Sequence, residues 1–324
     1  MKSYLVHLVL LFFMLYTASC SSSKKAYQET PEEINLVNES IIVSDTFVLP
    51  DIPEELTNPD ARADYLVLHF WDRFDFSDSK LIDRPEVTEQ AFVDYVNILN
   101  YASFKKAEES LVHTLRRTSE NNEMYHHFAS LFSKYLYDAN SPFRNEEFYI
   151  PVLREILKSD LLTEDEKSVY RLQYEFTQKN RVGHAANDFV YTLSSGERAK
   201  MSSVKSDFLI LFFSNPECST CLKVTDMITK SEVINKAFAH NSTQRTMLTI
   251  LTIYPDDDIE TWKSHVSELP ANWIHAYDKD MSITKNKLYD LKAIPTLYLL
   301  DKNKKVILKD VSVEIIEAFF ELPE

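Results

Sequence analysis

The sequence predicts an α+β protein of two domains, an all-helical domain at about residues 52–180 followed by an α/β domain at residues 182–324. The chain has 324 residues and is 44% hydrophobic, which is enough to form two cores. Apolar residues recur at helical spacing as far as about Asn180. Beyond that point, apolar runs of strand length alternate with helical stretches, a pattern typical of a mixed sheet covered by helices.

Composition excludes two classes of function. The chain carries 35 Lys and Arg against 50 Asp and Glu, a net charge of -15, which argues against a nucleic-acid-binding surface. Only two glycines occur, so a glycine-rich phosphate loop is excluded.

The first twenty residues have the pattern of an export signal. Lys2 precedes the mostly apolar run LVHLVLLFFML, which is too short to span a bilayer comfortably. Ala18 and Ser19 before Cys20 resemble a bacterial lipobox, whose cysteine is lipidated and becomes the first residue of the mature protein. We therefore expect residues 1–20 to be a lipoprotein signal peptide, with the protein facing the periplasm and lipid-anchored to the inner or outer membrane. The alternative is an ordinary secretory signal with an incidental cysteine.

The region from 21 to 180 divides into a tether and helices. Residues 21–51 begin with polar and charged residues and carry no helical stripe, so we expect a tether. Within 52–180, apolar residues three and four positions apart form a stripe along one face of a predicted helix, namely Met124, Phe128, Leu131, Phe132, Tyr135 and Leu136. Thr163 and Glu166 have the spacing of a capping box, which predicts the start of a final helix. The stripe indicates a compact domain of helices packed on helices.

The region after residue 182 alternates strands and helices. Predicted strands cover 207–214, 246–254 and 273–277, predicted helices cover 218–238, 259–266 and 311–320, and predicted hairpins are centred on Ser195-Gly196 and within 296–310. In the second hairpin, we expect Asn303 to take the positive φ that glycine usually adopts.

Two cysteines lie where the first of these strands passes into a helix. The strand ends at Ser214 and Cys218 stands at the helix start, where free backbone N–H groups and the helix dipole favour a thiolate. Cys221 lies one turn further along on the same helix face, close enough to attack a mixed disulfide formed at Cys218. The spacing and setting therefore predict a redox pair.

Two other interpretations of the pair are weaker. A zinc site needs about four ligands and this motif supplies two; the other candidate histidines lack ligand spacing, namely His184, His240, His265 and His275. Two inert buried thiols would be expected in the middle of a helix, whereas Pro216 and the preceding strand place this pair at a helix start. We expect no metal and no cofactor.

The segments FFSNPECSTC and LKAIPTLYLLDKNKKVIL resemble the thioredoxin superfamily, in particular its periplasmic TlpA-like and ResA-like branch. The resemblance implies a thioredoxin-like fold for residues 182–324, with Cys218 as nucleophile and Cys221 as resolving thiol. It also implies that Pro295 is a cis-proline beside the cysteine pair and that the backbone of Ile294 binds an extended substrate segment.

The preceding segment IPEELTNPDARADYLVLHFWDRFDFSD resembles the uncharacterised helical domain, DUF5106-like, found before thioredoxin-like domains in lipoproteins of Bacteroides-type bacteria. This second resemblance implies an architecture and no activity.

The sequence departs from the thioredoxin pattern beside the first cysteine and in the preceding strand. Glu217 stands where the family usually has tryptophan, and Phe212 stands where thioredoxin has a buried acid that assists proton transfer, so we expect slow turnover. Ser219 and Thr220 lack the histidine of strongly oxidising members, and Ile294 matches reducing thioredoxins. We therefore expect a reductant or isomerase, with a potential nearer about -270 mV than about -120 mV.

These observations together predict a membrane-anchored periplasmic thiol-disulfide oxidoreductase. Its partners would be protein thiols and disulfides, an electron donor, and the membrane through the lipid on Cys20. The alternative is a non-catalytic peptide-binding or scaffolding lipoprotein with a thioredoxin-like fold.

Overall fold

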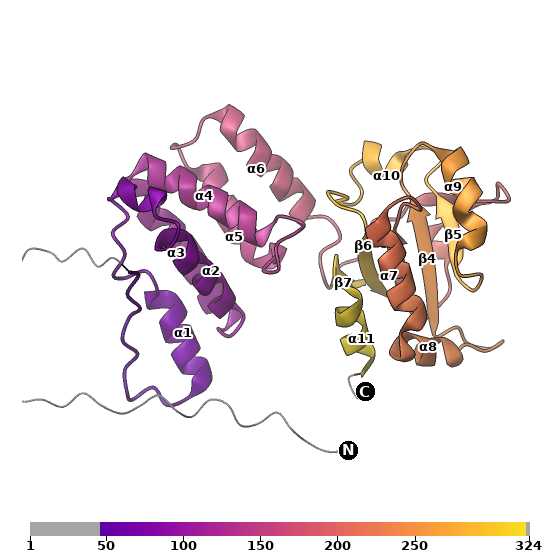
Figure 1. Ribbon diagram of the computed structural model, residues 1–324, viewed down its shortest axis with the longest axis horizontal. Coiled ribbons are helices and arrows are strands. Elements are labelled where there is room, and N and C mark those ends of the chain that lie inside the picture. Colours follow the sequence, from indigo (N-terminus) through magenta and orange to yellow (C-terminus); the bar gives the residue numbers. More distant parts are fainter. Residues whose placement is uncertain (1–45, 322–324) are drawn as a thin grey trace, which may run out of the picture. The chain divides into compact units, whose positions relative to one another are not determined.

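The computed structural model describes residues 46–321 and confirms the predicted fold class, a helical region followed by an α/β region with a mixed sheet (Figure 1). The expected signal peptide, with Cys20, and most of the expected tether lie outside the described residues. The described residues belong to one compact unit. We refer to α1 to α6 as the helical domain and to β1 to α11 as the α/β domain.

The helical domain is built from α-helices with two short 3-10 turns between them. The α-helices are α1 (Pro59–His69), α2 (Thr88–Leu99), α3 (Phe104–Arg117), α4 (Asn122–Leu136), α5 (Glu146–Lys158) and α6 (Glu164–Thr177), and the 3-10 turns are η1 (Ser79–Asp83) and η2 (Thr118–Glu120). Asn121 and Asn145 cap α4 and α5 with side-chain oxygens that accept from backbone N–H groups. The capping box of Thr163 and Glu166 is present at the start of α6, as predicted.

An aromatic cluster forms the core of the helical domain. The Trp71 ring lies 5.3 Å from that of Phe128 and 5.6 Å from that of Tyr95, in edge-on contacts that aromatic rings favour. Of the predicted α4 stripe, Phe128 and its apolar neighbours are buried, while Tyr135 is only partly buried. This core gives the helical domain its own source of stability.

The α/β domain is a seven-stranded mixed sheet in the order β2-β1-β5-β4-β3-β6-β7. The strands are β1 (Val190–Leu193), β2 (Arg198–Lys200), β3 (Phe208–Phe213), β4 (Leu248–Tyr254), β5 (Ile274–Tyr277), β6 (Thr296–Asp301) and β7 (Val306–Lys309). The helices are α7 (Ser219–Lys230), α8 (Glu232–Ala239), α9 (Ile259–His265), α10 (Ser282–Lys285) and α11 (Val313–Glu321), with 3-10 turns η3 (Met201–Ser203) and η4 (Val266–Glu268).

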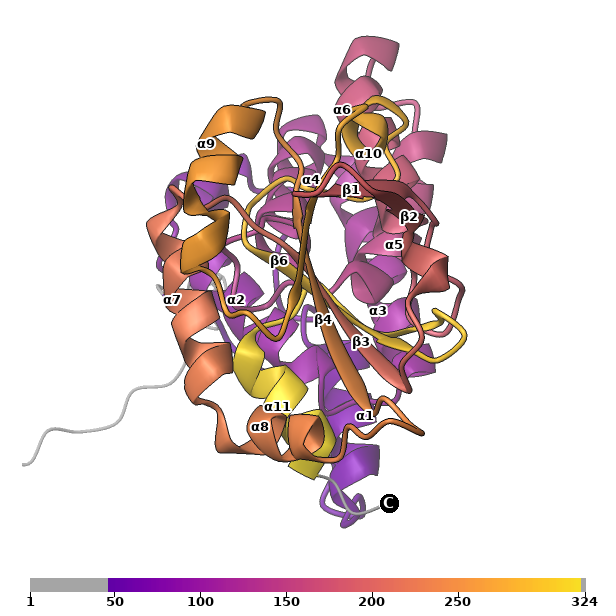
Figure 2. The same cartoon turned by 90° about the vertical axis from the view of Figure 1, so that its right-hand side faces the viewer.

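The central strand β3 pairs parallel with β4 and antiparallel with β6. Its residues are apolar at every position because both of its faces are covered. Ile210 and Phe212 pack in a cluster with residues of α7, α8 and α11, the helices seen together beside the sheet in Figure 2. Leu209, Leu211 and Phe213 point to the other core. The strand thereby fixes the start of α7 at its carboxyl end.

The second hairpin corrects the prediction for Asn303, because the residue with positive φ is Lys304, at 62°. The N–H of Lys304 donates to the carbonyl oxygen of Asp301 at 2.9 Å, and the Asp301 carboxylate accepts from the N–H groups of Asn303 and Lys305. This is a turn followed by one left-handed residue, so the left-handed position falls one residue later than expected.

Candidate functional site

Cys218 occupies the N-cap of α7, at the helix start predicted from the sequence. Its Sγ accepts a hydrogen bond from the N–H of Cys221, with a sulfur to nitrogen distance of 3.3 Å. The side chain of Asn215 accepts from the N–H of Glu217 at 2.9 Å, which orders the loop between β3 and the helix. The sulfur therefore faces a free N–H of the first helical turn, where negative charge on sulfur is favoured.

Cys221 lies in the first turn of α7 and is 1% exposed, whereas Cys218 is partly exposed. Burial raises the pKa of the Cys221 thiol to about 12, and the neighbouring Cys218 adds to the rise. The backbone N–H of Asn215 and the hydroxyl of Ser214 act in the opposite direction. The pair thus has an accessible outer thiol and a protected inner thiol, so an external disulfide can reach Cys218 before Cys221.

Phe212 is fully buried beside Cys221 in the core under α7. In thioredoxin, the position equivalent to Phe212 holds a buried acid. The side chain offers no proton acceptor, so deprotonation of Cys221 has no carboxylate at this position to assist it.

The loop before β6 lies directly against Cys218. The Ile294–Pro295 peptide bond is cis, as the resemblance implied. The Sγ of Cys218 lies 3.7 Å from the carbonyl oxygen of Ile294, a residue 76 positions away in sequence. The structure therefore brings together the four site residues that the sequence analysis named in this domain. Their roles in attack, resolution and substrate binding stay predictions.

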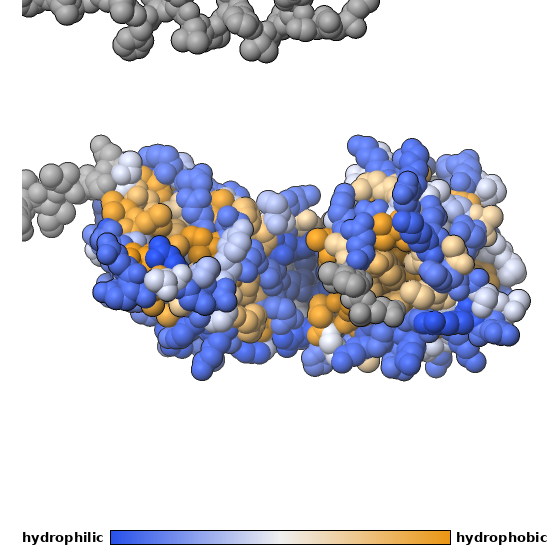
Figure 3. Space-filling model, turned by 90° about the horizontal axis from the view of Figure 1, so that it is seen from below, coloured by the Kyte–Doolittle hydropathy of each residue, from blue (hydrophilic) through white to orange (hydrophobic). Residues whose placement is uncertain are grey.

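A cavity of about 350 Å³ opens beside Pro295. It is lined by Val224 and Met227 of α7, Ala293, Pro295 and Leu297 of the loop and β6, residues 310–314 before and at the start of α11, and Ala139 and Arg144 of the α4–α5 connection. The lining from α7 and β6 is apolar. Figure 3 shows apolar surface on both domains, set within a largely hydrophilic surface. The cavity has the size and character of a recess for one apolar side chain or a short peptide segment.

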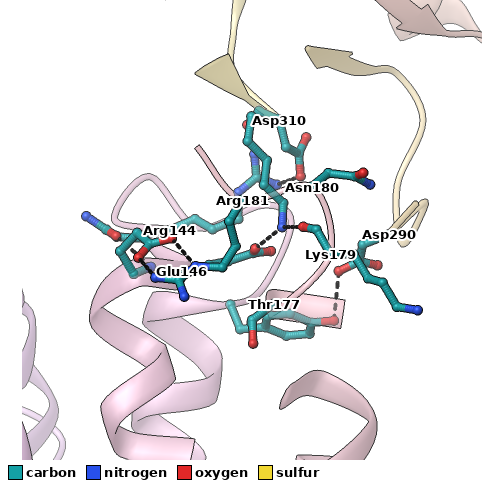
Figure 4. A network of polar contacts seen from close by, with 12 residues as sticks. Arg144, Glu146, Thr177, Lys179, Asn180, Arg181, Asp290 and Asp310 are labelled. Carbon is teal, nitrogen blue, oxygen red and sulfur yellow. Dashed lines mark hydrogen bonds and ion pairs between the residues drawn. The ribbon is translucent and has the colours of Figure 1, made fainter. Parts of the chain in front are cut away.

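A cluster of charged residues that the sequence did not predict lies between the α4–α5 connection and the loops around the site (Figure 4). It joins three basic side chains, Arg144, Lys292 and Lys309, to three acidic ones, Glu146, Asp290 and Asp310. Their side chains are 5 to 20% exposed. Except for Asp290 and Lys292, which are two positions apart, the partners lie far apart in sequence and follow no period, so no local pattern could have identified the cluster.

One member of the cluster is electrostatically perturbed. Burial raises the pKa of Asp310, although Arg144 and Lys292 lower it in part. The Arg144 guanidinium lies 2.9 Å from a carboxylate oxygen of Asp310 and also donates to its carbonyl oxygen. The ion pair therefore offsets part of the cost of burying this carboxylate.

A mixed sheet with a cysteine pair at a helix start, set against a cis-proline, defines a thioredoxin-like protein. Residues 206–306 match the thioredoxin-like family, and residues 19–180 match the domain of unknown function DUF5106. The chain belongs to the family in which a DUF5106 domain precedes a thioredoxin-like domain.

A solved structure agrees with this assignment. The chain is similar to a thioredoxin-like protein from Bacteroides caccae, at 42% identity and a TM-score of 0.82, over 86% of this chain and 99% of the other. It is also similar to the C-terminal domain of an uncharacterised protein from Bacteroides fragilis, at 39% identity and a TM-score of 0.42, over 44% of this chain and 99% of the other.

Among curated proteins, human nucleoredoxin is 26% identical over 123 residues, which is 38% of this chain. The match covers only 27% of nucleoredoxin's own length. The thioredoxin-like fold of this region supports a redox-type function.

Within residues 46–321, no helix has the length and apolar character needed to cross a bilayer. In the same residues, no group of three or more His, Cys, Asp and Glu side chains is arranged to hold a metal ion.

Proposed function

We propose that the protein is a membrane-anchored periplasmic thiol-disulfide oxidoreductase that reduces or isomerises protein disulfides. The observation that carries this proposal is the placement of partly exposed Cys218 Sγ at the helix start, 3.7 Å from the Ile294 carbonyl oxygen, with Cys221 buried one turn deeper. The anchor and the compartment rest on the lipobox-like pattern that ends at Cys20.

The reaction begins at Cys218. Its thiolate attacks one sulfur of a substrate disulfide, which forms a mixed disulfide and releases the other substrate sulfur as a thiolate. That thiolate takes up a proton from solvent. The substrate segment that carries the attacked sulfur lies along the Ile294 backbone, beside the cavity next to Pro295.

Cys221 completes the exchange. Its thiol gives a proton to solvent and the thiolate attacks Cys218 Sγ, which forms the Cys218–Cys221 disulfide and releases the second substrate sulfur as a thiolate that takes up a proton from solvent. Mixed-disulfide formation removes the negative charge from Cys218, one of the causes of the high pKa of Cys221, while the donors from Asn215 and Ser214 remain. The enzyme is oxidised by two electrons, and an external dithiol or equivalent electron donor then reduces it.

A trapping experiment tests this function. The Cys221→Ser variant lacks the resolving thiol, so we expect it to accumulate mixed disulfides at Cys218 with periplasmic proteins, detectable by non-reducing gels and mass spectrometry. The control is a Cys218→Ser variant, which should trap nothing. Equal adducts in both variants would contradict the assignment of Cys218 as nucleophile. A lack of adducts in both would favour a non-catalytic peptide-binding or scaffolding lipoprotein.

A further inference from the structure

The loop that carries the cis-proline has little regular structure of its own. Residues 286–295 contain no helix or strand, so backbone ladders do not fix their position. Leu288 is held through its carbonyl oxygen by the side chains of Asn180 and Asn187, each at 2.8 Å. Between Leu288 and Thr296, the side chains that anchor this loop to another element include Asp290 and Lys292.

Both of these side chains are held by the helical domain. The Lys292 ammonium lies 3.2 Å from a Glu146 carboxylate oxygen and 3.6 Å from the centre of the Tyr137 ring. The Tyr137 hydroxyl donates to Asp290 at 2.8 Å, and Asp290 in turn lies 2.8 Å from Lys292. Lys292 is two residues before Ile294, the residue whose carbonyl oxygen faces Cys218. The contacts therefore lie immediately before the part of the loop that meets the redox pair.

The segment before α11 is also held by the helical domain. The other carboxylate oxygen of Glu146 lies 2.6 Å from the Lys309 ammonium, and Arg144 binds Asp310. Asp310 and residues 311–314 line the same cavity as Pro295. The first turn of α5 and the connection before it thus contact both the loop that carries Pro295 and the segment that leads into α11.

These ion pairs differ from ordinary surface pairs. The side chains of Glu146 and Lys309 are 12% and 9% exposed, so solvent screens them weakly and loss of one partner leaves a charge without compensation. Surface pairs, in contrast, contribute little to the position of a loop.

We infer that the helical domain is part of the substrate site, in which Glu146 and Tyr137 act as positioning residues that hold the cis-proline loop for an extended polypeptide disulfide. The inference rests on the proposed function. A small disulfide needs only access to Cys218, whereas an extended segment also needs the Ile294 backbone in place. Loss of the anchor should therefore weaken exchange with polypeptides and leave exchange with glutathione nearly unchanged.

The Glu146→Gln variant tests the inference, and Glu155→Gln is its matched control. Both glutamates lie on α5, both side chains are mostly buried at 12% and 17% exposed, and both contact two basic side chains. The partners of Glu155, Arg116 and Lys158, lie within the helical domain. The control thus removes a comparable charge without touching the loops of the α/β domain.

Two measurements are made on each reduced full-length variant. The first is single-turnover oxidation by a synthetic peptide with one internal disulfide and, separately, by oxidised glutathione. We expect Glu146→Gln to raise the half-saturating peptide concentration about tenfold, because the loop loses its position. Its rate with glutathione should stay within about twofold, and Glu155→Gln should match the unsubstituted protein with both oxidants.

The second measurement is amide hydrogen exchange over residues 288–297, which reports loop order without any redox activity. We expect faster exchange there in Glu146→Gln and not in Glu155→Gln. Unchanged exchange in Glu146→Gln, or an equal loss of rate with peptide and glutathione, would overturn the inference. If the unsubstituted protein reacts with neither oxidant, the proposed function fails, and hydrogen exchange alone decides whether the helical domain holds the loop.

A milder pair of variants covers the case in which Glu146→Gln does not fold. Tyr137→Phe removes the hydroxyl that binds Asp290 and keeps the ring under Lys292. Tyr149→Phe removes a hydroxyl that donates to Gln173 inside the helical domain. Faster exchange over residues 288–297 in the first variant alone supports the inference, and identical behaviour of the two variants overturns it.

Discussion

The difference between the two thiols leads to a quantitative prediction for alkylation of the reduced, folded protein by iodoacetamide at pH 8. Burial and the neighbouring Cys218 raise the pKa of Cys221 from its ordinary value of 9.0 to about 12. At pH 8 the thiolate fraction therefore falls from about one in ten to about one in ten thousand, a loss of about 1000-fold. The Cys221 residue is also only 1% exposed, which further restricts access of the reagent.

The assay is a time course followed by mass spectrometry. Trypsin releases both cysteines in one peptide, residues 206–223, so fragment spectra must assign the label to Cys218 or Cys221. Within this peptide, we expect a single label, on Cys218, in the folded protein and two labels after unfolding in urea. In a Cys218→Ser variant, where burial remains as the main cause of the shift, the same peptide of the folded protein should stay unlabelled.

The reasoning would be refuted if folded Cys221 reacted at the rate of an unfolded thiol. That result would mean that the thiol is neither desolvated nor shielded, so the pair would lack its inner member. The measurement in urea excludes a trivial cause, since a thiol that is already oxidised stays unlabelled in both states.

Three further predictions concern the anchor, the acid stability and the helical core. Cys20→Ser should abolish incorporation of radiolabelled palmitate into the protein, and a variant that is labelled as strongly as the unsubstituted protein would exclude Cys20 as the lipid-anchored residue. Burial lowers the pKa of His275 below its ordinary 6.5, so the contribution of the neutral imidazole to the unfolding free energy is fully present above about pH 6.5 and is lost as the pH falls through the lowered value. Urea unfolding at pH 7.5 and 5.5 should therefore show a smaller decrease in unfolding free energy for His275→Gln than for a control substitution at an exposed histidine, His113→Gln. Phe128→Ala should cost about 3–5 kcal/mol of unfolding free energy, because it removes a fully buried ring from the aromatic cluster; a loss below about 1 kcal/mol in urea unfolding would show that this cluster does not hold the helical domain together.

The fold could be predicted from the sequence where local signals are strong. The apolar run of β3 and the capping box at Thr163 and Glu166 depend on neighbours in sequence, and the structure confirms both. Cys218 was placed correctly because a strand followed by a helix start is a local pattern. The turn at Asn303 was wrong by one residue, because the hydrogen bonds of the Asp301 side chain select the left-handed position, and composition alone does not show them.

The rest of the site depends on contacts between distant residues. Glu146 and Lys292 lie 146 positions apart, and neither stands out in its own segment. The cis-proline could be anticipated only through the resemblance to thioredoxin, since an isolated Ile-Pro dipeptide does not specify its isomer. The cavity beside Pro295 required two domains to be packed together, which periodicity does not describe.

Redox equilibration of the purified soluble protein in glutathione buffers tests the central claim most directly. If Cys218 and Cys221 form a working dithiol, they should show one reversible two-electron transition, abolished in either single serine variant. The stated role as reductant or isomerase predicts a midpoint nearer about -270 mV than about -120 mV. A midpoint more positive than about -170 mV would contradict the reducing role, and thiols that never equilibrate with glutathione would contradict the oxidoreductase itself.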